Sequence, residues 1–313
     1  MVLALAPGFG AAPVRIKAGK APNFLAISRD GSKAYVTSFA DGRFIEVNLQ
    51  RRVVTRSVIL GGSPLGFALA EGEKLAIIAC RDAGLTTIVD LDSFKIIADV
   101  KTGARPNSVA VDPRGYFAYV VDSGRSNTGA LHILDIRERN VTGTVKLGSS
   151  PFGIAISPVS EQVFVLIGGT NEVWVIDSAK QAVVGKIPVG EGPDGIAVTP
   201  DGKRVFVANS RSGSLTVIDA ETLRTQITIP VEKMPFGVAV SPDGKHVFVV
   251  NTGSRTLTAL PADLSSLSGD VFSIDKGSTD VKVSPDSKTV YVLSESENSI
   301  LIIERNRSGN TNG

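Results

Sequence analysis

Arginines recur in short polar segments of the sequence, and their guanidinium groups are the first candidates for ligand chemistry. Five of them follow runs of apolar residues at comparable places: Arg43, Arg81, Arg125, Arg211 and Arg255. Guanidinium groups bind carboxylate, phosphate or sulfate through paired hydrogen bonds, so a sector of them would hold an anion. A set of solvated charges is the other interpretation, because acids stand nearby: Asp41, Asp82, Asp122, Glu191, Asp194 and Glu232.

A second group of candidates lies beside prolines that end short Gly-containing corners. Arg105 and Asn107 flank one such proline, and Phe152, Asp194 and Phe236 each follow another. The phenylalanines could form an apolar floor or a stacking surface, or they could pack between structural units. Four arginines complete the predicted ligand-binding residues: Arg81, Arg125, Arg211 and Arg255. We expect a ligand first at the corner of residues 105–107 and the polar segment 122–129.

The residue types that usually carry catalysis are scarce. The two histidines, His132 and His246, stand far apart in the sequence, which argues against a zinc or haem site built from both. Cys80 ends an apolar run and is interpreted as a core residue. Glu295 and Glu297 lie in a polar segment, where solvation is a simpler interpretation than an acid–base pair. We predict no catalytic residues, no metal site and no cofactor.

Composition and charge describe an ordinary folded chain. It has 313 residues and a net charge of +2, which gives no general attraction to nucleic acid or to anionic membranes. No apolar run reaches the roughly 20 residues of a membrane helix. The segment 1–13 resembles the end of a secretory signal without its basic start, or a flexible tail. We expect a periplasmic or secreted monomer, with the cytoplasm as the alternative location.

A repeated motif organises the whole chain. The segment Pro193-Asp-Gly-Ile-Ala-Val-Thr-Pro-Asp-Gly202 recurs from Pro235 and Pro22, and weaker copies begin at Pro64, Pro106, Pro151 and Ser278. The copies start 42 to 45 residues apart and form seven units. This period is typical of β-propeller blades, whereas leucine-rich and helical repeats differ in period or strand content.

Each unit has the pattern of four antiparallel strands. In the fifth unit these are residues 195–199, 204–209, 214–219 and 226–229, separated by turn residues such as those of 200–202. Because the strands alternate in direction, the proline corners and the loops after each second strand emerge on one face, here called the top face. The arginines and the corner residues are therefore predicted to share that face.

The two ends of the repeat array complement each other. The seventh unit lacks a fourth strand, and the first unit is preceded by an orphan strand, Val14-Arg-Ile-Lys-Ala18. We predict that this N-terminal strand completes the last blade and closes the ring. The fold is then an all-β, seven-bladed propeller of four-stranded antiparallel blades over residues 14–305, followed by a polar tail at 306–313.

Four segments within the repeats carry a family resemblance: Tyr35-Val-Thr-Ser38, Tyr119-Val-Val-Asp122, Phe206-Val-Ala-Asn209 and Phe248-Val-Val-Asn251. They resemble YVTN β-propeller repeats, as in YncE-like proteins, over essentially the whole chain. The turns at 70–73, 158–161 and 261–269 depart from the repeat. The resemblance implies the propeller architecture and leaves the activity open.

These observations favour a binding or interaction module over an enzyme. We expect the funnel on the top face to hold a protein, a glycan or a small anion. A lactonase-like hydrolase is the first alternative, and it requires polar residues with a perturbed pKa at the central channel. Single-stranded nucleic-acid binding is the second, and it is disfavoured because aromatic residues are only 6% and acids interrupt the arginines.

Overall fold

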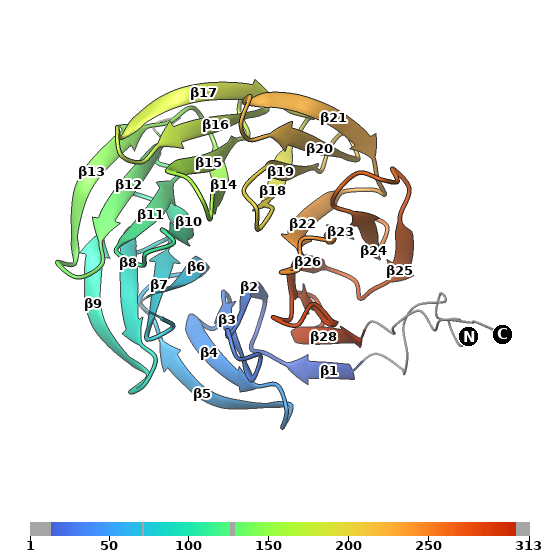
Figure 1. The fold of residues 1–313 in the computed structure, drawn as a ribbon. Helices are drawn as coiled ribbons and strands as arrows, with labels where there is room; N and C mark the ends of the chain where they lie inside the picture. Colours follow the sequence, from blue (N-terminus) through green and yellow to red (C-terminus); the bar gives the residue numbers. More distant parts are fainter. Residues whose placement is uncertain (1–13, 71, 126–128, 305–313) are drawn as a thin grey trace.

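The computed structural model describes residues 14–70, 72–125 and 129–304, and these form seven radially arranged β-sheets (Figure 1). Each sheet has four antiparallel strands, and none of the described residues is helical. The predicted all-β, seven-bladed propeller is thus confirmed. The described ranges contain no helix that is long and apolar enough to cross a membrane. The predicted tails at 1–13 and 306–313 lie outside them.

The strands follow the chain blade by blade. Blade 1 contains β2 (Pro22–Ile27), β3 (Lys33–Ser38), β4 (Arg43–Asn48) and β5 (Val53–Ile59). Blade 2 contains β6 (Pro64–Ala70), β7 (Leu75–Cys80), β8 (Leu85–Asp90) and β9 (Lys95–Lys101). Blade 3 contains β10 (Pro106–Val111), β11 (Phe117–Asp122), β12 (Ala130–Asp135) and β13 (Asn140–Lys146). Blade 4 contains β14 (Pro151–Ile156), β15 (Gln162–Ile167), β16 (Glu172–Asp177) and β17 (Ala182–Pro188).

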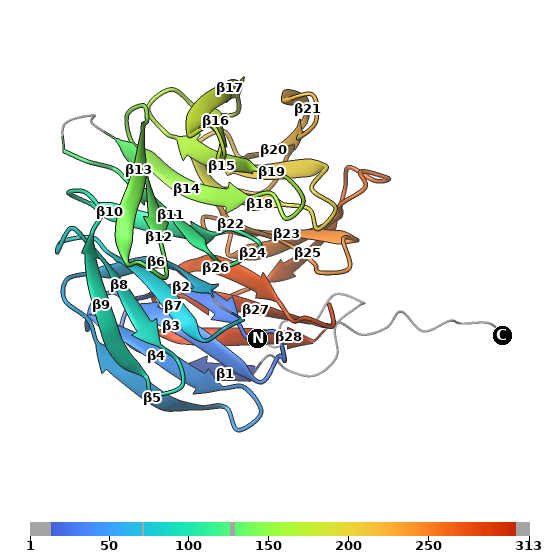
Figure 2. The ribbon, with the colours of Figure 1, turned by 60° about the vertical axis from the view of Figure 1, so that its left-hand side comes forward.

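The remaining blades keep the same order. Blade 5 contains β18 (Pro193–Val198), β19 (Arg204–Asn209), β20 (Ser214–Asp219) and β21 (Arg224–Pro230). Blade 6 contains β22 (Pro235–Val240), β23 (His246–Asn251), β24 (Thr256–Pro261) and β25 (Asp270–Ser273). Blade 7 contains β26 (Ser278–Val283), β27 (Thr289–Ser294), β28 (Ser299–Glu304) and β1 (Val14–Lys17). The first strand of each blade, or β26 in blade 7, lies next to the axis (Figures 1 and 2).

Blade 7 joins the two ends of the propeller. Its sheet order is β1-β28-β27-β26, and β1 pairs antiparallel with β28 from Val14 opposite Ile302 to Lys17 opposite Ser299. An ion pair of 2.7 Å between Arg15 and Asp275 adds to this pairing. The orphan strand therefore closes the ring as predicted, so the first and last blades leave no open gap.

The hydrophobic core lies between neighbouring blades. The second strand of every blade is covered on both faces, which explains its nearly continuous apolar sequence. Phe206 of blade 5, for example, is fully buried in a cluster with Val238 and Val249 of blade 6. Because each blade packs on the next in this way, the core is divided into repeated layers around the channel.

Turn chemistry explains the repeated hairpin residues on the face opposite the top. Asp201 Oδ1 accepts hydrogen bonds from Thr199 Oγ1 and from the Lys203 amide, and Gly202 adopts a φ of 71°. Asp219 likewise accepts bonds from the Thr222 amide and hydroxyl. These bonds hold the pKa of both carboxyls below their usual range. The hairpin acids are thus accounted for by structure alone.

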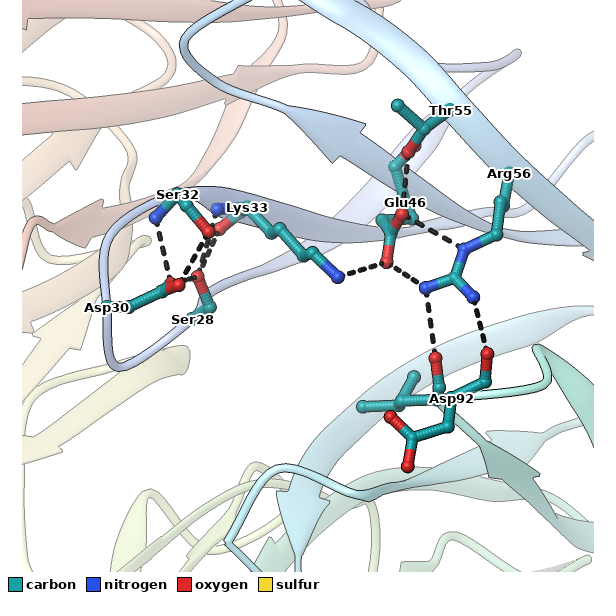
Figure 3. Close-up of polar contacts among 9 residues, drawn as sticks. Ser28, Asp30, Ser32, Lys33, Glu46, Thr55, Arg56 and Asp92 are labelled. Atoms are coloured by element: carbon teal, nitrogen blue, oxygen red, sulfur yellow. Dashed lines mark hydrogen bonds and ion pairs between the residues drawn. The ribbon is translucent and has the colours of Figure 1, made fainter.

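An ion cluster around the buried Glu46 joins blades 1 and 2 (Figure 3). Glu46 accepts hydrogen bonds from Lys33, Thr55 and Arg56. Arg56 also donates to the Leu91 and Asp92 carbonyls of blade 2. Burial disfavours the charge of Glu46, but these hydrogen bonds outweigh it and lower its pKa to about 2.

Candidate functional site in the central channel

A cavity of about 370 Å³ occupies the central channel. The innermost strands of the blades line it. At the top face its wall includes the residues that come directly after the corner proline, or after the equivalent serine in blade 7. These are Asn23, Phe152, Asp194, Phe236 and Thr279. The volume lies near the lower end of the range for small-molecule sites. The cavity is therefore large enough for a compact ligand.

A β-bulge aims each corner residue out of its sheet. In blade 5 the register with β19 shifts between Pro193 and Gly195, so Asp194 is left without a partner in the ladder. In blades 4 and 6 the register shifts between Pro151 and Ile154 and between Pro235 and Val238, so Phe152 and Phe236 are also outside the ladder. The repeat thus places residues from successive blades at one level of the channel.

Gly195 lets blades 5 and 6 approach each other beside Asp194. A Cβ atom on this glycine would lie 1.9 Å from the Phe236 carbonyl oxygen, which no side chain could tolerate without movement of the backbone. The close approach brings Phe236 beside Asp194 at the channel wall. A small residue after the corner is therefore a requirement of the site's geometry.

Asp194 is the carboxylate of this site whose environment most favours proton chemistry. It is half-buried, and burial raises its pKa above the usual value against the opposing effects of Ser210 and Arg211. The loop that carries these two residues is fixed on the blade 5 corner, because the Ser210 and Arg211 amides donate to the Gly192 and Glu191 carbonyls. A carboxylate with a raised pKa in a cavity can act as a general base.

Asp280 lines the same cavity and is fully committed to structure. Its Oδ2 accepts a hydrogen bond of 2.9 Å from the Leu25 amide of blade 1. Its Oδ1 accepts from the Val281 amide at 2.9 Å and from Lys282 Nζ at 2.7 Å. This carboxylate therefore fastens blade 7 to blade 1, and Lys282 balances its charge.

The structure separates the residues proposed from sequence into two sets. Phe152, Asp194 and Phe236 line one cavity, where the two rings belong to the blades on either side of Asp194. Asn107 is 3% exposed and donates to the Pro151 carbonyl at 3.0 Å instead of lining the cavity. The arginines lie outside the cavity wall: Arg81 is half-buried, and Arg105, Arg125, Arg211 and Arg255 are exposed. Ligand contact by either set stays a prediction.

The channel residues that the sequence did not single out include three with polar side chains: Ser108, Asp280 and Lys282. A signal for Asp280 and Lys282 was present, because the first strand of the seventh unit is charged at two positions where the other units have small or apolar residues. An aspartate and a lysine two positions apart on a strand share one face. This spacing could have predicted a channel ion pair.

The residues considered for metal or nucleophile chemistry occupy structural positions. Among the described residues, no group of three or more His, Cys, Asp or Glu side chains is arranged to hold a metal ion. His132 Nδ1 contacts Thr144 Oγ1 at 3.1 Å on β12, whereas His246 lies on β23. Cys80 is fully buried, and burial raises its thiol pKa to about 11, which suppresses the reactive thiolate.

Comparison with known proteins adds a family to this geometry. A family model described as "SMP-30/Gluconolactonase/LRE-like region" matches residues 48–236. A solved structure of Kuenenia stuttgartiensis hydrazine synthase has a TM-score of 0.82 at 21% identity, covering 91% of this chain and 95% of that one. That likeness concerns the fold alone. No curated protein matches the chain. The chain belongs to the SMP-30/gluconolactonase/LRE-like family.

Proposed function

We propose that the chain is a lactonase-like hydrolase that opens a cyclic ester at the top of the central channel. Membership of the gluconolactonase-like family supports this alternative over the non-catalytic module expected from the sequence. The single structural observation that carries it is Asp194, a half-buried carboxylate with a raised pKa on the cavity wall. This is the perturbed channel residue that the hydrolase alternative required.

Asp194 would act as the general base. The ionised carboxylate takes a proton from a water molecule while the water oxygen bonds to the carbonyl carbon of the lactone. The ring carbon–oxygen bond of the resulting tetrahedral species then breaks, and Asp194 returns the proton to the leaving alkoxide. The product is a hydroxy acid, and the carboxylate of Asp194 is regenerated.

Arg211 has a supporting role in this reaction. Its charge favours the ionised form of Asp194, so it keeps the base ready near neutral pH. The same positive charge at the channel entrance would favour the anionic transition state and attract the carboxylate product. Because Arg211 is exposed, this contribution is expected to be smaller than that of Asp194.

A resident divalent cation is a common aid to ester hydrolysis, and it needs several oxygen ligands. The carboxylates present do not fit one. Asp280 already accepts bonds from two backbone amides and from Lys282, and Asn107 does not reach the cavity wall. Asp194, the other carboxylate among the described lining residues, supplies one ligand group where a cation needs several. The mechanism above therefore uses protein groups alone.

The test measures hydrolysis of a panel of lactones. Proton release in a weakly buffered indicator solution reports the rate. We expect turnover of at least one lactone, and a loss of about 100-fold or more in kcat/KM for Asp194→Asn. Glu191→Gln is the matched control, because it removes an exposed carboxylate from the same corner and leaves the cavity wall unchanged. Absence of turnover on every lactone, or equal rates for Asp194→Asn and the wild type, would refute the proposal.

Non-catalytic binding of a small anion is the second candidate function. The exposed arginines of the top face favour it: Arg105, Arg125, Arg211 and Arg255. A thermal-shift screen of anionic metabolites against the wild type and an Arg125→Ala, Arg211→Ala double variant tests this candidate. Stabilisation by one anion class that the double variant loses, without turnover of any lactone, would select binding over hydrolysis.

A further inference from the structure

The wall of the channel cavity is largely apolar, and its polar side chains lie away from the segments that flank Asp194. Around Asp194 it consists of Phe152 and Ile154 from blade 4 and Phe236 and Val238 from blade 6. The other blades contribute a mixed wall, with the apolar side chains of Phe24, Leu25, Phe67 and Val109 beside the polar ones of Asn23, Ser108, Thr279, Asp280 and Lys282. The candidate base thus lies among apolar groups, although polar residues occur elsewhere in the same cavity.

Both phenylalanines remain accessible to a ligand. They are half-buried and line the cavity, whereas the corresponding Leu65 of blade 2 is 6% exposed and does not line it. The bulges after Pro151 and Pro235 hold the two rings on either side of Asp194. Aromatic side chains in this position offer a flat apolar contact to a ligand next to the reacting group.

A polyhydroxylated lactone would fit this side of the cavity poorly. Each hydroxyl group placed against the two rings would lose its hydrogen bonds to water, and the side chains of the flanking segments replace none of them. The segments beside Asp194 are Phe152-Gly-Ile154 and Phe236-Gly-Val238, which contribute no polar side chain. The polar groups close to the base are Ser210 and Arg211, which already act on its carboxylate.

We infer that the substrate is a lactone with an apolar aryl or alkyl group beside its ester, and not a sugar lactone. This inference rests on the proposed hydrolase function and adds the substrate class. Phe152 and Phe236 are its specificity-determining residues, because their rings contact the apolar part of the lactone while Asp194 activates the water.

The kinetic test compares dihydrocoumarin, 5-pentyl-γ-butyrolactone and glucono-1,5-lactone as substrates. For the wild type we expect kcat/KM for dihydrocoumarin to exceed that for the sugar lactone by about 10-fold or more. Phe152→Ala and Phe236→Ala should each lower kcat/KM for the two apolar lactones by about 10-fold and change the sugar lactone value little. Leu65→Ala is the matched control and should leave the ratio unchanged. Preference for the sugar lactone, or a ratio that neither phenylalanine variant alters, would overturn the inference.

A binding test separates this inference from the proposed function. The unreactive lactam 3,4-dihydro-2-quinolinone replaces dihydrocoumarin in a thermal-shift titration of the wild type, Phe152→Ala and Phe236→Ala. Stabilisation of the wild type that weakens in both variants would support the apolar subsite even if no lactone were hydrolysed. Absence of stabilisation of the wild type by this lactam would overturn the subsite, even if a sugar lactone were hydrolysed.

Discussion

Asp194 and Asp280 line the same channel and have opposite surroundings. Asp194 lines the cavity from blade 5, between the blades that carry Phe152 and Phe236, and burial raises its pKa. Asp280 accepts hydrogen bonds from blade 1 and from its own blade and is paired with Lys282. The difference shows that the partners of a channel carboxylate, and not its residue type, decide whether it is available for chemistry.

The largest expected effect comes from Asp194→Asn. It should reduce kcat/KM by about 100- to 10,000-fold, because a general base typically contributes that much. The same substitution should not lower the free energy of unfolding. A raised folded-state pKa means that the ionised carboxylate is disfavoured in the fold, so the variant should be at least as stable as the wild type at pH 7. Urea unfolding measures this, and a marked destabilisation would assign Asp194 a structural role.

Asp280→Asn should lower stability and leave activity nearly unchanged. The substitution weakens the contact between blades 7 and 1 and leaves Lys282 without its partner, so we expect a loss of about 2 kcal/mol in the free energy of unfolding. The folded fraction should keep kcat/KM within about threefold of the wild type. Asp270→Asn, an exposed site on β25, is the control. Full stability together with lost activity would contradict the division between the two acids.

Glu46 extends the comparison to a carboxylate far from the channel. Its lowered folded-state pKa contributes stability at pH values above its unfolded value, and this stability is lost as the pH falls toward about 2. Glu46→Gln should therefore cost about 2 kcal/mol at pH 7 and much less near pH 2. Unfolding at both pH values, beside the exposed Glu221→Gln, checks this. An equal cost at both values would show that the charge of Glu46 is not the cause.

The smallest effect is expected from Arg211→Gln. Arg211 lowers the pKa of Asp194, so its removal should raise that pKa further. The acid limb of the kcat/KM profile should then move to higher pH, while Arg224→Gln on the opposite face should leave it in place. A shift of the acid limb to lower pH would show that the charge of Arg211 does not stabilise the ionised form of Asp194.

The sequence repeat is sufficient to predict the fold. The properties of the site depend on contacts between blades, which the repeat pattern does not specify. The seven corners and the orphan strand at Val14 were sufficient to predict the blades and the closure. The corner position also selected Phe152, Asp194 and Phe236. The raised pKa of Asp194 depends on packing between blades, and the roles of Asp280 and Lys282 depend on blade 1 lying beside blade 7. Such contacts join residues far apart in the chain.

The sequence analysis favours a binding module over a hydrolase, and this preference shows a second limit of prediction from sequence. It was inferred from the scarcity of histidines and of recognisable catalytic motifs. A single carboxylate made more basic by burial leaves no such motif, because its neighbours come from separate blades. The family match therefore shifts the balance toward hydrolysis.

The pH dependence of kcat/KM on dihydrocoumarin, measured for the wild type and Asp194→Asn, tests the central claim most directly. We predict that wild-type activity falls as the pH decreases through a single pKa above the usual aspartate value, and that the variant lacks this limb and most of the activity. Absence of wild-type turnover, or the same limb and the same rates in the variant, would contradict the assignment of Asp194 as the base.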